Sequence, residues 1–144
     1  MKTIIFVCHG SICRSPACEY IAKSLSQEHR FISRAISHEE IGNDIYPPMK
    51  EALAKAGIPY GKHHAAYLSK ADLQEADAVF YMDESNKRRL FYVYPEFASK
   101  MKPVFCYTPG ITEIEDPWYT DRFDLVVEQL QHCVKDILSH LDKE

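Results

Sequence analysis

The sequence lacks a long hydrophobic run, and no segment approaches the roughly 20 apolar residues that a membrane-spanning helix needs. It also lacks an excess of positive charge, because 21 aspartates and glutamates outweigh 17 lysines and arginines and give a net charge of −4. This balance argues against a general nucleic-acid binder. We therefore expect no membrane and no nucleic-acid partner, and any small anionic ligand would need a local positive site.

The sequence also lacks the patterns of cysteine and histidine that form disulfide frameworks or metal sites. The five cysteines are an odd number, which fits poorly with a full disulfide framework. The apolar run behind Lys2 is too short for a signal peptide, so we expect a cytoplasmic protein with reduced thiols. A zinc site at Cys8 and Cys13 is disfavoured because no second cysteine or histidine pair stands at ligand spacing, His63 and His64 being adjacent. We expect no bound metal.

The chain shows no internal repeat, low-complexity tract or linker, and its length fits a single domain over residues 1–144. Short apolar segments predict buried strands at residues 3–8, 30–37, 77–82 and 103–107. Helical patterns begin at Pro16, at Pro47 with Gly57 as the C-terminal cap, at Glu84, and near Arg122. This alternation predicts an α/β fold, a small doubly wound sheet of four parallel strands with helices on both faces. Such folds bind ligands beyond the carboxyl ends of their strands.

What the chain does contain is the segment CHGSICRSP, residues 8–16, directly after the apolar residues of the first strand. As a loop between a strand and a helix, it can turn the amides of residues 9–14 around a tetrahedral anion, with the positive end of the helix behind them. Gly10 permits the backbone angles of this turn, and Arg14 offers a planar fork for two phosphate oxygens. We predict a phosphate-binding loop after the first strand, formed by His9, Gly10, Ser11, Ile12, Cys13 and Arg14.

Cys8 lies at the start of this loop. The helix N-terminus, the inward amides and the Arg14 guanidinium favour its thiolate form, so we predict that Cys8 is an in-line nucleophile toward a bound phosphorus. Ser15 can hydrogen-bond the sulfur and help the thiolate to leave. A lone cysteine is more often a small buried hydrophobe. The C-x5-R-S spacing between a strand and the helix start at Pro16 favours the catalytic interpretation instead.

Attack by a thiolate expels an alkoxide or phenolate that needs a proton. In EIEDPWYT, Asp116 precedes Pro117 in a loop between the last strand and the last helix, at the same end of a parallel sheet as Cys8. We predict that Asp116 acts as general acid and then as general base toward water; a capping or turn aspartate is the alternative. Trp118 and Tyr119 can stack on an aryl ring in the substrate cleft, which favours phosphotyrosine over phosphoserine, with core packing as the alternative for Trp118.

VCHGSICRSP, MDESNKRRL at 82–90 and DPWY at 116–119 resemble the low-molecular-weight protein tyrosine phosphatases, and GIPYGKHHAAYLSKAD is similar to their middle segment. The resemblance covers essentially the whole chain. It implies hydrolysis of a phosphotyrosine-containing protein or peptide through phosphocysteine, without metal or other cofactor, by Cys8 as nucleophile, Arg14 as phosphate clamp and Asp116 as general acid. It also implies that Ser15 tunes the thiolate and that Cys13 has a redox role, trapping Cys8 as a reversible disulfide under peroxide. We expect a monomer or weak dimer.

Two positions depart from the family pattern. The family usually has asparagine in place of Ser11, and asparagine tolerates left-handed backbone angles better than serine does. We therefore expect a less rigid or slower cradle. Glu39 stands where many members carry a tryptophan that lines the cleft, so we expect a partly acidic cleft wall. We interpret His9 as a solvent-facing loop residue.

Four other functions remain as alternatives. A protein arginine phosphatase of the same fold would be expected to carry a small polar residue in place of Ile12. A thiol-linked arsenate reductase would need further cysteines between Cys18 and Cys106, where the chain has none. A phosphocysteine carrier should lack the clamp and the proton donor. A catalytically weak phosphoprotein-binding module would keep the cradle but would not need a nucleophile.

Overall fold

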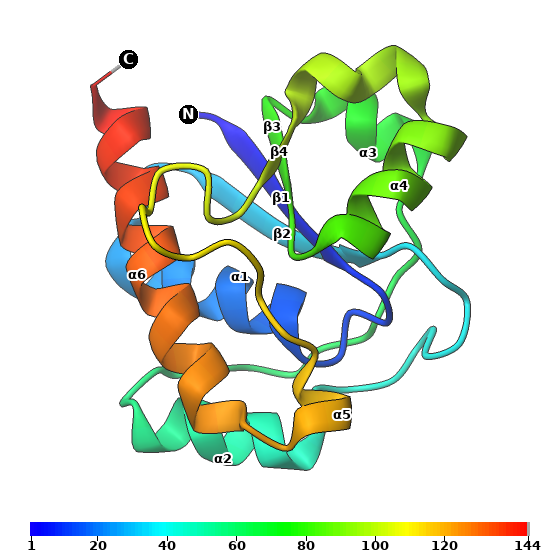
Figure 1. The fold of residues 1–144 in the computed structure, drawn as a ribbon. Helices are drawn as coiled ribbons and strands as arrows, with labels where there is room; N and C mark the ends of the chain where they lie inside the picture. The colour runs from blue at the N-terminus through cyan, green and yellow to red at the C-terminus, as the bar shows by residue number, and fades with distance from the viewer. Residues whose placement is uncertain (144) are drawn as a thin grey trace.

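Four strands form one parallel sheet in the order β2-β1-β3-β4 (Figure 1). The structure is a computed structural model that describes residues 1–143. Its strands are β1 (Thr3–Cys8), β2 (Arg30–Ala35), β3 (Ala78–Tyr81) and β4 (Met101–Pro103). β1 pairs in parallel with β2 on one side and with β3 on the other. The predicted four-stranded parallel sheet is confirmed, and its first strand lies in the interior of the sheet.

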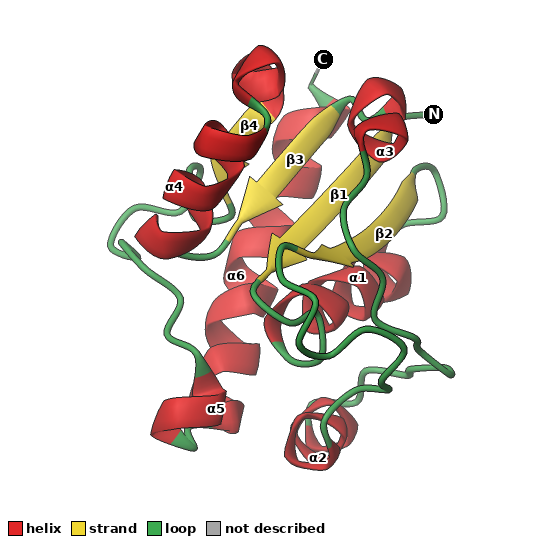
Figure 2. Cartoon of the chain, turned by 90° about the vertical axis from the view of Figure 1, so that its right-hand side faces the viewer, coloured by secondary structure: helices red, strands yellow, loops and turns green. Residues whose placement is uncertain are grey.

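Helices cover both faces of the sheet, as the sequence predicts (Figure 2). On one face lie α1 (Arg14–Leu25), α2 (Pro47–Lys55) and α6 (Phe123–Asp142). On the other face lie α3 (Lys70–Glu75), α4 (Glu84–Val93) and the 3-10 helix η1 (Pro95–Lys100). The short helix α5 (Pro117–Thr120) precedes α6. Among the helices of residues 1–143, none combines the length and the apolar character that crossing a membrane requires.

The side chains of β1 alternate between two apolar cores. Ile4, Phe6 and Cys8 belong to the core that contains α1, α2 and α6. Ile5 and Val7 belong to the core that contains α3 and α4. All five are buried, which explains why the strand is a continuous apolar run rather than an alternating one. Cys8 therefore ends its strand on the face that α1 covers.

The predicted fourth strand was wrong in its position. β4 covers Met101–Pro103, not residues 103–107. Val104 still donates its N–H to the Tyr81 carbonyl, but the chain then turns, and the Cys106 N–H donates back to the Pro103 carbonyl. The apolar residues after Pro103 pack toward α6 instead of extending the sheet, with the Tyr107 ring stacked on His140 at a centroid distance of 4.0 Å.

Other boundaries also differ from the predictions. β2 ends at Ala35 rather than at residue 37, and the next two N–H groups, of Ile36 and Ser37, donate to the carbonyls of Cys8 and His9 at the end of β1. α1 begins at Arg14, two residues before Pro16. Pro16 still lies in the first turn, where its missing N–H has no helical partner to lose. Three short helices, α3, α5 and η1, were not predicted from the sequence, and each has six residues or fewer.

Candidate active site

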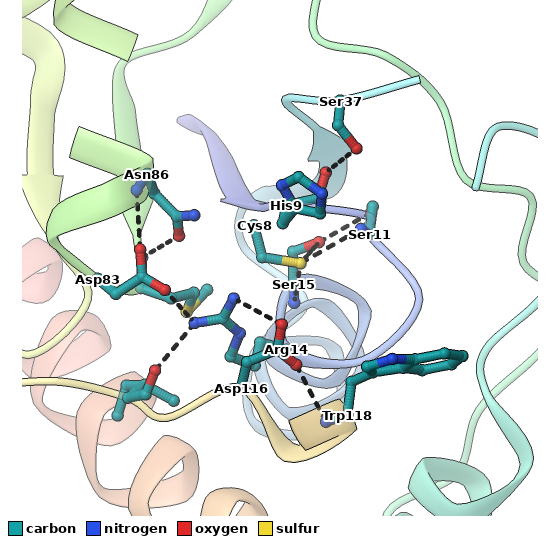
Figure 3. Close-up of polar contacts among 12 residues, drawn as sticks. Cys8, His9, Ser11, Arg14, Ser15, Ser37, Asp83, Asn86, Asp116 and Trp118 are labelled. Carbon is teal, nitrogen blue, oxygen red and sulfur yellow. Dashed lines mark hydrogen bonds and ion pairs between the residues drawn. The ribbon is translucent and has the colours of Figure 1, made fainter. Parts of the chain in front are cut away.

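The Cys8 sulfur lies among hydrogen-bond donors where β1 turns into α1 (Figure 3). The backbone N–H groups of Ser11 and Ser15 donate to Sγ over 3.3 and 3.4 Å. The Ser15 hydroxyl oxygen lies 3.3 Å from the same sulfur. A backbone N–H can only donate, so these contacts stabilise an anionic sulfur more than a neutral one. Cys8 and Ser15 lie together, as a nucleophile and its hydrogen-bond partner require.

Ser11 adopts the left-handed backbone conformation, with φ of 57°. A serine is strained there, and three contacts hold it. Its N–H donates to the Cys8 sulfur, its Oγ lies 2.8 Å from Ser15 Oγ, and its carbonyl lies 2.6 Å from His63 Nε2. Ser11 and His63 are both buried. The loop therefore holds the conformation that asparagine would favour, through contacts on three sides of the serine.

Arg14 is 2% exposed and is held by groups from two other parts of the chain. Its Nη1 donates to Asp83 Oδ2 over 2.7 Å and to the Ile114 carbonyl over 2.9 Å. Its Nη2 lies 3.5 Å from Asp116 Oδ2. Burial alone would lower the pKa of Arg14, but Cys8 and the two aspartates together raise it, so the guanidinium stays charged. A fixed positive charge thus lies beside the sulfur.

Asp116 lies on the same cleft although 108 residues separate it from Cys8 in the sequence. Its two carboxylate oxygens have different partners. Oδ1 accepts the Trp118 N–H over 3.1 Å and so caps α5, whereas Oδ2 faces Arg14. The capping role considered as an alternative is therefore real, but it occupies one oxygen and leaves the other directed toward the cleft.

These groups line one cavity of about 120 Å³. Trp118 and Tyr119 form part of its wall and are 50% and 83% exposed, so neither is a core residue. The Trp118 ring contacts Tyr46 at a centroid distance of 4.7 Å, and the Tyr46 N–H donates to the Ile12 carbonyl over 2.9 Å. Tyr46 thus connects the loop around Cys8 to the aromatic wall.

Another part of the wall carries His9, Glu39 and Glu40. His9 Nε2 lies 2.9 Å from Glu39 Oε2, and both side chains are largely exposed. His9 is therefore solvent-facing, as expected, and Glu39 lines the cleft. The predicted loop residues also line this cavity: His9, Gly10, Ser11, Ile12, Cys13 and Arg14. The structure brings together every site residue predicted from the sequence, with Ser15 behind the sulfur.

The other thiols differ from Cys8 in their surroundings. Burial, with Cys8 beside it, raises the pKa of Cys13 well above its usual range. Burial likewise raises the pKa of Cys18, Cys106 and Cys133, the last to about 11. These four thiols therefore stay protonated at neutral pH, and Cys13, which lines the cleft, is a neutral partner for the Cys8 sulfur.

A second group of titratable residues lies at the other end of the sheet. Glu28, His29 and Asp142 place potential metal-ligand atoms within 4.8 Å of one another. His29 Nδ1, however, accepts the Lys2 backbone N–H over 3.1 Å, so the proton of a neutral ring is on Nε2. The nitrogen that faces Asp142 is then a donor and not a metal ligand.

The comparisons with known proteins agree with this geometry. The family model for low molecular weight phosphotyrosine protein phosphatases matches residues 3–144. The low molecular weight phosphotyrosine protein phosphatase of Gallus gallus is 34% identical over 150 residues, covering 96% of this chain and 94% of that protein. The chain belongs to the low molecular weight phosphotyrosine protein phosphatases.

Solved structures show how closely this phosphatase keeps the family fold. The low molecular weight protein tyrosine phosphatase from Streptococcus pyogenes matches with a TM-score of 0.90 at 30% identity, covering 98% of this chain and 93% of the other. An arginine phosphatase from Geobacillus stearothermophilus matches with a TM-score of 0.88 at 22% identity, covering 99% and 94%. The second match shows the shared fold alone, so the choice between phosphotyrosine and phosphoarginine depends on the side chains of the cleft.

Three side chains that organise the site of this phosphatase were missed in the sequence analysis. Asp83 caps α4 and pairs with Arg14, His63 holds the Ser11 carbonyl, and Tyr46 supports Trp118. One signal could have identified Asp83, because it follows a strand and so lies at the same edge of the sheet as Cys8. No comparable signal marks His63 or Tyr46, since both lie in connections whose paths only the folded chain defines.

Proposed function

We propose that this chain hydrolyses phosphotyrosine in proteins or peptides through a phosphocysteine intermediate on Cys8. The observation that carries the proposal is the convergence of an anion-stabilised sulfur, a buried guanidinium and a carboxylate on one cavity. Thiolate, fixed cation and carboxyl group are the three parts that phosphoryl transfer to sulfur requires. Cys8 and Arg14 come from one loop and Asp116 from a segment about a hundred residues later, so the arrangement is a product of the fold.

In the first step the Cys8 thiolate attacks phosphorus as the bond from phosphorus to the phenolic oxygen breaks. Asp116 donates its proton to that oxygen, and tyrosine leaves. Arg14 and the N–H groups of residues 9–14 hold the phosphoryl oxygens, where negative charge is spread during transfer. The Arg14 guanidinium therefore supplies the positive charge that this step needs.

In the second step water attacks the phosphorus of phosphocysteine and the S–P bond breaks. The Asp116 carboxylate takes a proton from the water, inorganic phosphate leaves, and the Cys8 thiolate is restored. Ser15 stabilises the departing sulfur, with its Oγ 3.3 Å from Sγ. Peroxide oxidises the Cys8 sulfur to a sulfenic acid and is itself reduced to water. The Cys13 sulfur, at the same cleft, then attacks the Cys8 sulfur and displaces its oxygen as water, which forms a reversible disulfide.

Ile12 and the aromatic wall favour phosphotyrosine over phosphoarginine. Ile12 is buried and lines the cleft with an apolar side chain, which offers no hydrogen bond to a guanidinium. Trp118 and Tyr119 present exposed rings on which an aryl group can stack. A phosphocysteine carrier is disfavoured because Arg14 and Asp116 are both present at the cavity. A binding module is disfavoured because the hydrogen-bond donors around Cys8 support a nucleophile.

We also propose that residues 1–144 act as one phosphatase domain, as a cytoplasmic monomer or weak dimer. Two apolar cores on the two faces of one sheet support the single domain. All five cysteines are free thiols, which supports a reducing compartment.

The proposed function is tested by a side-by-side assay. Phosphotyrosine, phosphoserine and phosphoarginine peptides of one sequence are compared in the presence of EDTA, with p-nitrophenyl phosphate as a peptide-free substrate. We expect turnover of phosphotyrosine and p-nitrophenyl phosphate, little release from the other two, and complete loss in Cys8→Ser. Preferred hydrolysis of phosphoarginine, or persistent activity in Cys8→Ser, would overturn the proposal.

A further inference from the structure

The cleft around Cys8 is chemically asymmetric. One part of its wall is aromatic, formed by Trp118 and Tyr119, and another carries the carboxylates of Glu39 and Glu40. Figure 3 shows His9, the partner of Glu39, and Trp118 entering the site from different segments of the chain. A phosphotyrosine whose phosphate reaches Cys8 must therefore place its neighbouring residues beside an acidic rim.

The two glutamates are held in place at this rim. Ser37 donates both its N–H and its hydroxyl to the His9 carbonyl, which fastens the segment before Glu39 to the phosphate loop. Glu39 is paired with His9 at 2.9 Å. The stem of Glu40 packs against Gly10, where an added Cβ would lie 3.1 Å from Glu40 Cγ. The Glu40 carboxylate Oε2 accepts a hydrogen bond from Asn43 Nδ2 over 2.6 Å, so both carboxylates have partners that hold them beside the phosphate loop.

The positive charge of the cleft is already engaged. Among the residues that line this cavity in the described chain, Arg14 is the only lysine or arginine, and it is paired with Asp83 and Asp116. Three carboxylates line the same cavity, from Glu39, Glu40 and Asp116. The Glu39 side chain is 70% exposed and can meet a charge on a bound peptide. Outside the phosphate loop itself, the rim repels anions and attracts cations.

We propose that Glu39 and Glu40 make this phosphatase selective for phosphotyrosine flanked by lysine or arginine, and against phosphotyrosine flanked by aspartate or glutamate. The inference rests on the proposed function and adds to it the charge of the preferred substrate. Glu39 contributes most, because its carboxylate is the more exposed, and its partner His9 carries a full charge only when protonated. Glu40 adds a second, partly buried carboxylate beside the phosphate loop.

The experiment compares kcat/KM for three phosphotyrosine peptides that differ only in the residues on both sides of phosphotyrosine, which are lysine, alanine or glutamate. We expect the lysine-flanked peptide to exceed the glutamate-flanked peptide by about tenfold in the wild-type enzyme. In the double variant Glu39→Gln/Glu40→Gln the ratio should fall to about twofold or less. Raising the salt concentration should reduce the wild-type ratio, because exposed charges are screened.

Glutamine keeps the size of each glutamate side chain, and in Glu40→Gln it keeps the stem against Gly10. The matched control is Glu128→Gln, which removes an exposed charge on α6 and should keep the full wild-type ratio. A preference for acidic peptides, equal values for all three, or a ratio that survives in the double variant would overturn this inference.

Failure of the inference and failure of the proposed function give different results. If the wild-type enzyme hydrolyses p-nitrophenyl phosphate and all three peptides equally well, only the charge selectivity is wrong. If it hydrolyses none of them, the phosphatase proposal itself fails.

Discussion

Arg14 and Asp83 are 69 residues apart in the chain, yet Arg14 Nη1 lies 2.7 Å from Asp83 Oδ2. Their side chains are 2% and 15% exposed, so this is a nearly buried ion pair between the phosphate loop and the start of α4. Asp83 uses its other oxygen to accept the Asn86 N–H over 2.8 Å as the N-cap of α4. One aspartate therefore orients the guanidinium and begins a helix.

Asp83→Asn separates these two roles, because asparagine is as good an N-cap as aspartate but carries no charge. We expect the free energy of unfolding to fall by about 2 kcal/mol, since a buried guanidinium loses a charged partner. Inhibition by inorganic phosphate should weaken as Arg14 loses its orientation. Urea denaturation and inhibition kinetics measure the two effects. Asp124→Asn, which breaks the exposed Lys55–Asp124 pair, is the control and should change stability by less than about 0.5 kcal/mol. Unchanged stability in Asp83→Asn would contradict the role of the pair.

Asp116→Asn keeps an acceptor for the Trp118 N–H and removes the transferable proton. We expect kcat for a poor leaving group, such as phenol from phenyl phosphate, to fall by roughly 10²- to 10⁴-fold. The loss should be smaller with p-nitrophenyl phosphate, whose leaving group needs less protonation. Steady-state kinetics on both substrates give the comparison. An equal loss on both substrates would show that Asp116 does not act as the proton donor.

The pH dependence should be bell-shaped and centred on the acidic side of neutral, because a thiolate at Cys8 and a protonated carboxyl at Asp116 must coexist. If Asp116 is the proton donor, the basic limb should disappear in Asp116→Asn. Ionisation of the substrate phosphate affects both profiles equally when the two enzymes are assayed with the same substrate, so it does not contribute to the difference between them. A profile of kcat/KM that is flat in the wild type, or a basic limb that persists in the variant, would contradict the pairing.

Asp72 provides a test of stability away from the active site. Burial alone would raise its pKa, but the Ser69 N–H and the Arg34 guanidinium, each 3.0 Å from Oδ2, together lower it. With a lowered pKa in the folded state, the unfolded chain binds more protons, so this stabilisation is present above about pH 4 and is lost as pH falls through the folded-state pKa. We expect Asp72→Asn to lower stability by about 1 kcal/mol at pH 7 and by less near pH 3.

Denaturation at both pH values checks this expectation. Glu75→Gln, which breaks the exposed pair with Arg30, serves as the control and should show little change at either pH. A difference between the wild type and Asp72→Asn that is constant with pH would mean that the carboxylate charge is not responsible.

Much of the site follows from the sequence because a parallel sheet gathers the carboxyl ends of its strands. Cys8 ends a recognisable strand, and Asp116 precedes the last helix, so topology alone places both at one edge. The contacts that hold the site do not follow from the sequence. Tyr46 reaches Trp118, and His63 reaches Ser11, through connections without a repeating pattern.

The error at β4 has the same physical origin. The apolar residues of 103–107 indicate burial, and Val104 is indeed buried, but burial is satisfied equally by a strand and by a turn that packs on α6. Ser11 is the reverse case. The structure shows contacts from Ser15 and His63 that support its left-handed angle, and the slower or less rigid cradle stays a prediction.

In the proposed reaction the Cys8 sulfur receives the phosphoryl group. Rapid acid quenching during turnover of p-nitrophenyl phosphate with EDTA present, followed by mass spectrometry of the intact enzyme and its peptides, measures this directly. We predict a transient mass increase of one phosphoryl group on the peptide that contains Cys8, and none in Cys8→Ser. Steady turnover with no phosphoenzyme on that peptide, or with the group on another residue, would contradict the account.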